Sequence, residues 1–327
     1  MHRLLSIASL SIAAALLSGC PEPAGFEPAF DATEVGWLMN TWGFDRDGLL
    51  AVGGGPAAGV MLRYDGEWTR EDLGVDVPLL NWIHGFGASD VTVVGNSGTV
   101  LHFDGTAWIQ GDSGTTENLW GVWGATPDDL WAVGGSGFPD ATAIVIHYDG
   151  TAWTTSELPV LERDVHGFFK VWGAAADDVY VVGQRGVVLH WDGAAWTELL
   201  VGANDDLVSI WGTAPDRIVA VGGRGNGIVA RWDGTEWTSQ FLTPLPGLNG
   251  VWTRDGQTIH VAGVRGTLGT LDFDTLEFTD MTANDLRDFH SLFGVGGRVT
   301  AVGGNLATGL AGPYRGIAYW RELSADE

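Results

Sequence analysis

Residues 179–196 read Val-Tyr-Val-Val-Gly-Gln-Arg-Gly-Val-Val-Leu-His-Trp-Asp-Gly-Ala-Ala-Trp, and most of the chain repeats this pattern. A β-branched run ends in glycine, a Gly-containing loop follows, and a second run ends in an aromatic residue, Asp-Gly and, soon after, tryptophan. Asp-Gly between two β-rich runs is a strong hairpin signal, because both central residues of such a tight turn need positive φ. The pattern therefore predicts short antiparallel strands joined by tight turns.

The repeat runs through almost the whole chain. The ends of its second run are Tyr64-Asp65-Gly66, Phe103-Asp104-Gly105, Tyr148-Asp149-Gly150, Trp191-Asp192-Gly193 and Trp232-Asp233-Gly234, with a degraded sixth copy at Phe273-Asp274-Thr275. Aromatic-Gly pairs and their equivalents supply seven anchors, namely Trp42, Phe86, Trp123, Trp172, Trp211, Trp252 and Phe293. Their spacings are 44, 37, 49, 39, 41 and 41 residues, and a period of about 42 is typical of propellers and solenoids.

Each unit predicts four short antiparallel strands, one of which carries the anchor. No helical apolar spacing persists in the chain after its N-terminal segment, so the predicted fold class is all-β. A small sheet that is apolar on both faces must stack against copies of itself, and radial stacking buries both faces and leaves only short edges. We therefore predict a seven-bladed β-propeller of four-stranded antiparallel blades.

The last unit predicts how the ring closes. Trp320 occupies the third-strand aromatic position, and only seven residues follow it, too few for a packed fourth strand. Phe26 and Phe30 occupy the matching place before the first anchor. We expect residues around 26–30 to supply the outer strand of the last blade, which joins the two ends of the propeller.

The fuller consensus, Val-Gly-x-x-Gly-x-Val-x-His-aromatic-Asp-Gly-x-x-Trp, resembles known propeller repeats. The strand end followed by aromatic-Asp and tryptophan resembles a kelch repeat, and Asp-Gly-x-x-Trp is similar to a shortened Asp-box of sialidases. The pattern also resembles the Asp-box-like propellers of photosystem assembly factors and of repeat lipoproteins from predatory or gliding bacteria. This resemblance covers nearly all of residues 26–323 and implies the fold, but propellers host enzymes, lectins and scaffolds alike.

The peptide Leu17-Ser18-Gly19-Cys20 resembles the lipobox of a bacterial lipoprotein signal. It closes a largely apolar run that begins at Leu4 and is too short for a transmembrane helix. Cys20 is the only cysteine, so we expect cleavage before it and lipidation of its thiol, palmitate included. The predicted organisation is a signal peptide over 1–19, a lipid-anchored linker over 20–25 and the propeller over 26–327. Pro21 does not resemble the aspartate that retains lipoproteins at the inner membrane, so the expected location is the outer membrane, on its periplasmic face or at the cell surface.

Composition limits the partners. The chain has 41 acidic residues against 16 Lys and Arg, a net charge of −25, and Lys170 as its single lysine. The negative electrostatic potential of such a chain repels phosphate backbones, which argues against nucleic-acid binding. Without a second cysteine there is no disulfide framework, so packing must stabilise the fold.

Most repeated residues are expected to be structural. Three histidines stand at equivalent positions in separate blades, too far apart to ligate one ion, and we expect each to pack against the next blade: His102, His147 and His190. The repeated tryptophans are expected between blades. Three others stand outside the consensus and are candidates to line the pore: Trp37, Trp82 and Trp120. No cofactor or metal site is predicted.

An arginine series is the leading candidate for a binding site. Its members directly precede glycine in the loop between the second and third strands: Arg185, Arg224, Arg265 and Arg315. They would form an arc on one face, and guanidinium groups suit carboxylate, sulfate or phosphate. The expected ligand is anionic, an acidic polysaccharide or a protein partner. The alternative is that each arginine pairs with an acidic residue of a neighbouring blade.

A polysaccharide-active enzyme, a sialidase-like hydrolase or lyase, is the alternative function. Such a site needs a tyrosine nucleophile with its carboxylates beside the arginines, and Tyr314 is the one tyrosine expected in a variable loop. No Ser-His-Asp order, phosphate loop or zinc motif is present. The sequence favours a membrane-anchored, non-catalytic propeller that serves as a binding or scaffolding surface, with its lipid on the side of the Asp-Gly hairpins.

Overall fold

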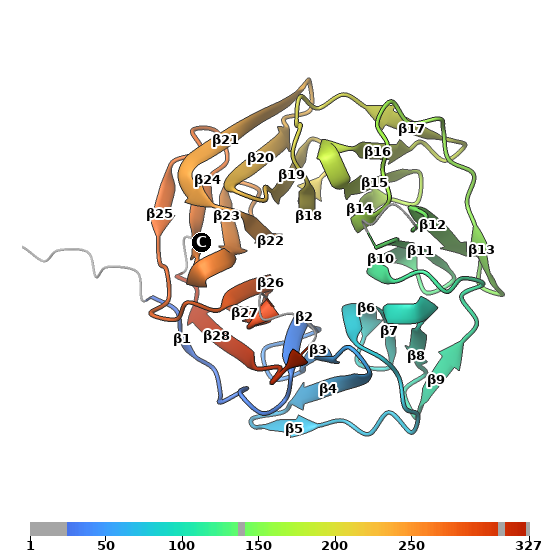
Figure 1. Cartoon of the computed structure of the whole chain (residues 1–327), viewed down its shortest axis with the longest axis vertical. Coiled ribbons are helices and arrows are strands. Elements are labelled where there is room, and N and C mark those ends of the chain that lie inside the picture. The colour runs from blue at the N-terminus through green and yellow to red at the C-terminus, as the bar shows by residue number, and fades with distance from the viewer. Residues whose placement is uncertain (1–24, 137–140, 307–310, 325–327) are drawn as a thin grey trace, which may run out of the picture.

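The computed structural model describes residues 25–136, 141–306 and 311–324, which form seven four-stranded antiparallel sheets. Figure 1 looks down the axis of the ring that these sheets make. The prediction of a seven-bladed β-propeller is confirmed. The predicted signal peptide and the lipid on Cys20 concern residues outside the described ranges. Within those ranges, no helix has the length and apolar character needed to cross a membrane.

Each blade runs from an inner strand at the axis to an outer strand at the rim. Blades 1 and 2 are β2 Trp37–Gly43, β3 Leu49–Gly55, β4 Ala58–Tyr64 and β5 Trp68–Arg70, then β6 Leu80–Gly87, β7 Asp90–Gly95, β8 Val100–Phe103 and β9 Trp108–Gly111. Blades 3 and 4 are β10 Leu119–Thr126, β11 Asp129–Gly134, β12 Ile144–Tyr148 and β13 Trp153–Thr155, then β14 Phe168–Ala175, β15 Asp178–Gly183, β16 Val188–Trp191 and β17 Trp196–Leu199. Blades 5 and 6 are β18 Leu207–Ala214, β19 Arg217–Gly222, β20 Asn226–Trp232 and β21 Trp237–Pro246, then β22 Leu248–Trp252, β23 Thr258–Gly263, β24 Leu268–Asp272 and β25 Phe278–Asp280.

Blade 7 consists of β26 Asp288–Val295, β27 Arg298–Gly304 and β28 Gly316–Glu322, completed by β1 Glu27–Pro28 from the other end of the chain. Glu27 pairs with Trp320, and Figure 1 shows β1 in blue beside β28 in red. The Phe30 ring stacks on Trp68 of blade 1 with a centroid distance of 4.8 Å. The predicted N-terminal closure of the last blade is confirmed.

The aromatic-Gly anchors have a steric explanation. A methyl group at Gly173 would lie 2.6 Å from the Trp123 ring of the preceding blade, and one at Gly212 would lie 2.5 Å from Trp172. In five blades the inner strand carries a glycine that admits a ring of the previous blade: Gly85, Gly124, Gly173, Gly212 and Gly294. Blade 6 has Thr253 in this place. Because the ring of one blade packs on the glycine of the next, the aromatic residue and the glycine recur together.

The strand position of the anchor in blade 2 lies two residues before the predicted Phe86. His84 pairs with Thr92 as Trp123 pairs with Trp131, so His84-Gly85 is the equivalent of the aromatic-Gly pair. The ring of Phe86 nevertheless does the packing, because a methyl group at Gly124 of blade 3 would lie 3.0 Å from it. Phe86 thus replaces the anchor in its contact but not in its strand position.

The Asp-Gly hairpins are wider than predicted. Phe103 pairs with Trp108, which leaves four residues in the connection, and only the glycine of Asp104-Gly105 has positive φ. Oδ1 of Asp104 instead accepts hydrogen bonds from the backbone N–H groups of Thr106 and Ala107, at 2.8 and 2.9 Å. The aspartate therefore caps the turn and does not occupy its left-handed position.

The sixth hairpin also has a different register from the prediction. Leu271 pairs with Phe278, so Asp272 and not Asp274 is the equivalent of the capping aspartate. Oδ1 of Asp272 accepts from the backbone N–H of Thr275 at 2.8 Å, and Leu276 takes the left-handed conformation with φ of 56°. Two additional residues in this loop account for the degraded repeat.

Candidate functional site

The predicted arginine series lies on one face of the ring, in the loops between the second and third strands of blades 4 to 7. Two of these loops are single turns of the same shape, Gln184–Gly186 and Val264–Gly266, with the arginine in the left-handed conformation at φ of 55° and 58°. The backbone N–H of Arg185 donates to Asp206 at 2.8 Å, and that of Arg265 donates to Asp288 at 3.0 Å. The acidic residues before the next inner strand thus bind the arginine backbone and leave the side chain outside.

The guanidinium groups of the series differ in their contacts. Arg185, Arg265 and Arg315 are exposed, and their side chains form no ion pair with any residue in the described ranges. Arg224 is paired, because its Nε lies 2.6 Å from Asp206 Oδ2, and its guanidinium carbon lies 5.5 Å from the centre of the Phe169 ring. Arg224 therefore pairs with an acidic residue, but Asp206 directly precedes the inner strand of the same blade 5 and not of a neighbouring one.

Two further arginines lie beside the series and were not identified from the sequence. The guanidinium of Arg163 donates to the backbone carbonyls of Arg185 and Ala203, the second at 2.7 Å. Arg287 forms an ion pair with Asp285 at 2.6 Å and donates to the carbonyl of Gly316. Both occupy connections between blades, which vary in length and have no repeat register to reveal them.

The propeller axis holds a cavity of about 260 Å³, which side chains from all seven inner strands line. Trp82 lines it, as predicted for a pore position. Trp37 is buried, with its indole N–H donating to Asn305 at 3.0 Å and its ring edge-on to Tyr314. Trp120 packs into the same apolar cluster as Trp37, so neither lines the cavity.

Lys170, the only lysine, is buried near this axis. Its Nζ donates to the carbonyl of Trp120 at 2.9 Å and lies 4.1 Å from the centre of the Trp82 ring. Burial lowers the pKa of Lys170 to about 7. His290, whose Nδ1 lies 2.8 Å from the carbonyl oxygen of Met39, has its pKa lowered to about 3, first by burial and then by the charge of Lys170.

The three equivalent histidines are not brought together, and they pack within their own blades, not against the next one as expected. His147 stacks on Trp131 at 4.1 Å, and His190 stacks on Tyr180 at 4.5 Å. Each also lies within 2.8 Å of an aspartate of its own blade. His102 has no such ring beside it in its blade, because Thr92 occupies that position, and its side chain is 43% exposed.

Tyr314, the candidate nucleophile of the enzyme alternative, has a packing role. Its ring lies 4.7 Å from that of Trp37 in an edge-on arrangement, and a methyl group at Gly55 would lie 2.8 Å from it. These contacts place Tyr314 at the seam between blades 7 and 1. They account for its position next to Arg315 by packing between the two blades.

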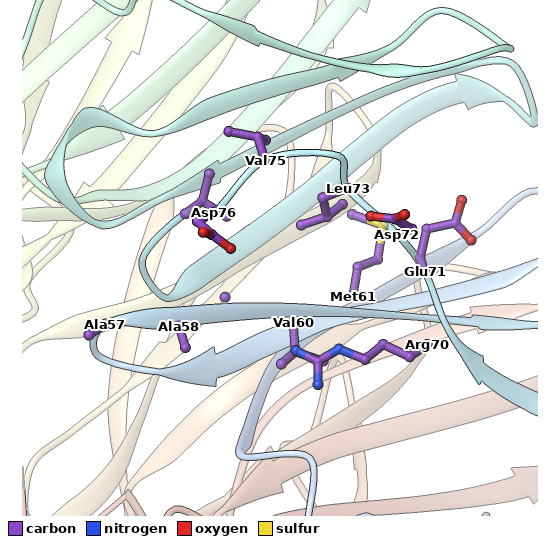
Figure 2. A pocket seen from close by; sticks show the side chains of 12 residues that line it. Ala57, Ala58, Val60, Met61, Arg70, Glu71, Asp72, Leu73, Val75 and Asp76 are labelled. Carbon is purple, nitrogen blue, oxygen red and sulfur yellow. The ribbon is translucent and has the colours of Figure 1, made fainter.

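A hollow of about 350 Å³ lies between β4 and the loop 71–77, which Figure 2 shows with Asp76 and Val75 above the turn of Ala57 and Ala58. Its carboxylates are partly engaged: Glu71 forms an ion pair with Arg63 at 2.8 Å, and Asp72 accepts from the N–H of Gly74. These internal contacts stabilise the loop and do not converge on a common point.

Two solved structures share this architecture. YCF48 bound to D1 peptide superposes with a TM-score of 0.66 and 15% identity, over 93% of this chain and 98% of that one. The WD40 β-propeller domain of Doa1 superposes with a TM-score of 0.69 and 8% identity, over 90% and 96%. At these identities the likeness shows the fold alone. No family model matches the chain, and no curated protein matches it.

Proposed function

We propose that this chain is an exported, lipid-anchored propeller that acts as a non-catalytic binding surface for an acidic segment of a protein partner. The observation that carries the proposal is the exposure of Arg185, Arg265 and Arg315 on one face of a chain whose net charge is −25. Guanidinium groups bind carboxylates through paired hydrogen bonds, so this face offers a local cationic arc to an extended acidic ligand.

A peptide is favoured over a glycan for one reason. A propeller of the same architecture, YCF48, has been solved with a peptide bound. An acidic polysaccharide presents the same carboxylates and is the rival ligand. The kelch-like and Asp-box-like character of the repeat is compatible with both.

The anchor is proposed at Cys20, with palmitate among its acyl chains and the outer membrane as its location. β1 replaces the outer strand of blade 7, and outer strands begin after the Asp-Gly hairpins. Residues 20–25 span at most about 20 Å when extended. The hairpin face would then lie toward the bilayer, and the arginine loops would point away from it.

Titration of the protein with an oligo-Asp/Glu peptide and with a uronic-acid oligosaccharide tests the ligand. The triple variant Arg185→Gln, Arg265→Gln, Arg315→Gln should lower the affinity for the peptide at least tenfold and weaken its salt dependence. The control is Arg254→Gln, an exposed arginine in the connection between β22 and β23 on the opposite face. Equal effects of triple variant and control would refute the proposal, and preferential binding or turnover of the oligosaccharide would replace it.

Protease footprinting on intact membranes tests the orientation. The Asp-Gly hairpins should be protected, and the loops that carry Arg185 and Arg265 should be cut. Protection of the arginine loops would contradict the proposed orientation, and release of the protein by Cys20→Ser is the expected result for the anchor.

A further inference from the structure

The seams between blades have a recurrent chemistry. At three of them an arginine of one blade lies over an aromatic ring of the next: Arg63 over Phe103 at 5.9 Å, Arg231 over Phe273 at 5.7 Å and Arg298 over Tyr64 at 6.0 Å. These are cation–π contacts, which strengthen when the cation is partly removed from water. The fold thus uses a guanidinium group repeatedly to fill the space beside the third strand of the following blade.

Two other seams are filled by an aromatic residue. Trp131 of blade 3 lies 5.1 Å from both Trp191 and Trp196 of blade 4. Tyr180 of blade 4 lies 6.1 Å from Trp237 of blade 5. Trp131 and Tyr180 occupy the same position in their second strands, as their pairing with His147 and His190 shows.

The seam between blades 2 and 3 has neither filler. Thr92 stands where Trp131 and Tyr180 stand in the following blades, and His102 stands where Arg63 stands in blade 1. A groove of about 530 Å³ remains there, with Tyr148 and Trp153 of blade 3 on one side. Figure 1 shows the two sides as neighbours, β7 to β9 next to β11 to β13.

The side chains of blade 2 at this groove are unusually open. Ile109 of β9 lines it and is 51% exposed, although it is a large apolar residue. The side chain of His102 is 43% exposed, against 31% for His147 and 25% for His190. The groove therefore combines an aromatic wall with apolar surface that the propeller itself does not cover.

The charge of the groove indicates what would fill it. Among the residues that the structure describes, three carboxylates line it, those of Asp90, Asp112 and Asp128, and no arginine or lysine does. A group that is planar, cationic and able to lie on Tyr148 or Trp153 is complementary to this lining. We propose that the groove between blades 2 and 3 binds an arginine side chain of a partner polypeptide, in the manner that Arg63, Arg231 and Arg298 occupy other seams.

This site is independent of the arginine face. Its ligand has the opposite charge, and its lining residues belong to other blades than Arg185, Arg265 and Arg315. A partner with one acidic and one basic segment could therefore contact both sites. The two proposals are separated by experiment, because each has its own variants.

The test uses the full chain in detergent and the peptide acetyl-Gly-Arg-Gly-amide, followed by NMR of the Trp153 indole N–H and the Ile109 methyl groups. Saturable shifts at both residues are expected with the arginine peptide, and at least tenfold weaker binding with its citrulline analogue, which keeps the shape and loses the charge. Equal binding of the citrulline peptide, or shifts that avoid both residues, would overturn the proposal.

Variants of the groove make the test specific. Thr92→Trp copies Trp131 of the next blade, and should fill the groove and lower the affinity at least tenfold. Asp128→Asn should lower it several-fold without a change in volume, and it decides the matter where Thr92→Trp fails to fold. The matched control is Asp76→Asn, an exposed acid in the hollow of Figure 2. A loss of affinity in the control equal to that in Asp128→Asn would attribute binding to net charge and refute the site.

Discussion

Lys170 Nζ lies 4.1 Å from the centre of the Trp82 ring, so that one side chain of blade 4 contacts blade 2 near the propeller axis. Burial lowers the pKa of Lys170 from 10.5 to about 7. The unfolded chain therefore holds more protons than the native state between these two values. Stability should fall as the pH decreases from about 10 to 7 and should not depend on this group below 7.

Lys170→Met should remove that slope. The variant keeps the length of the side chain and the contact with Trp82, but it has no proton to lose, and replacing a buried charge by an apolar group of similar volume is often neutral or stabilising. Urea unfolding at pH 7, 8.5 and 10 should show that the variant is at least as stable as the wild type at pH 7. Between pH 7 and 10, its free energy of unfolding should increase less than that of the wild type. Arg254→Met, which removes an exposed cation, is the control. An unchanged pH slope in the Lys170 variant would show that its ammonium stays charged in the native state.

His290→Asn should reduce the sensitivity of the fold to acid. Burial, followed by the charge of Lys170, lowers the pKa of His290 from 6.5 to about 3, so stability is lost as the pH falls between these values. Asn249, at the same place in blade 6, donates to the carbonyl of Phe289 at 2.9 Å, so asparagine can replace the contact of His290 with Met39. Denaturation experiments between pH 6.5 and 4 measure the free energy of unfolding. It should fall less steeply with decreasing pH in the variant than in the wild type, by up to about 1.4 kcal/mol per pH unit. A slope equal to that of the wild type would exclude His290 as the responsible group.

Gly173→Ala should destabilise the propeller by about 1–3 kcal/mol, as overpacking does. The added methyl group would lie 2.6 Å from the Trp123 ring, which is held between blades 3 and 4. Gly87→Ala is the matched control, because it lies at the end of an inner strand and meets no heavy atom within 4 Å. Thermal unfolding of both variants should shift only for Gly173. Similar shifts would mean that the glycines are selected for the backbone and not for the ring.

The blade number and the closure of the ring could be predicted because each unit carries its own local signals. An Asp-Gly turn and a Val-Gly strand end depend on neighbouring residues only, and the anchor ring recurs at a regular spacing along the chain. The sequence pattern predicts Phe86 as the anchor of blade 2, whereas His84 holds the equivalent strand position. The reason is that the Phe86 ring, two residues further along the strand, supplies the contact with Gly124 from the same side. A sequence pattern detects the ring and not the pairing.

The binding features were harder to predict than the fold. The arginines of the series stand at the same position of consecutive repeats, and this spacing predicts that they lie on one face. Arg163 and Arg287 lie in connections that do not repeat from blade to blade. The groove between blades 2 and 3 arises because Thr92 has no aromatic ring. A missing ring becomes visible only when the strand partners of Trp131 and Tyr180 are known.

Phe30→Ala should weaken the closure of the ring before it affects the rest of the propeller. The Phe30 ring stacks on Trp68 of blade 1, while the neighbouring Ala29 N–H donates to the carbonyl of Ala318 in blade 7. Phe30 is only partly buried, so we expect a loss of about 1–3 kcal/mol, below the 3–5 typical of a fully buried phenylalanine. Phe44→Ala, at a phenylalanine that is 42% exposed, is the control.

Hydrogen exchange in the Phe30 variant should accelerate first in β28 and β1 and not in β14 to β17, because a local opening exposes only the amides of the strand pair that separates. Uniform acceleration over all blades would contradict this prediction and would show that the strand pair opens only when the whole ring unfolds.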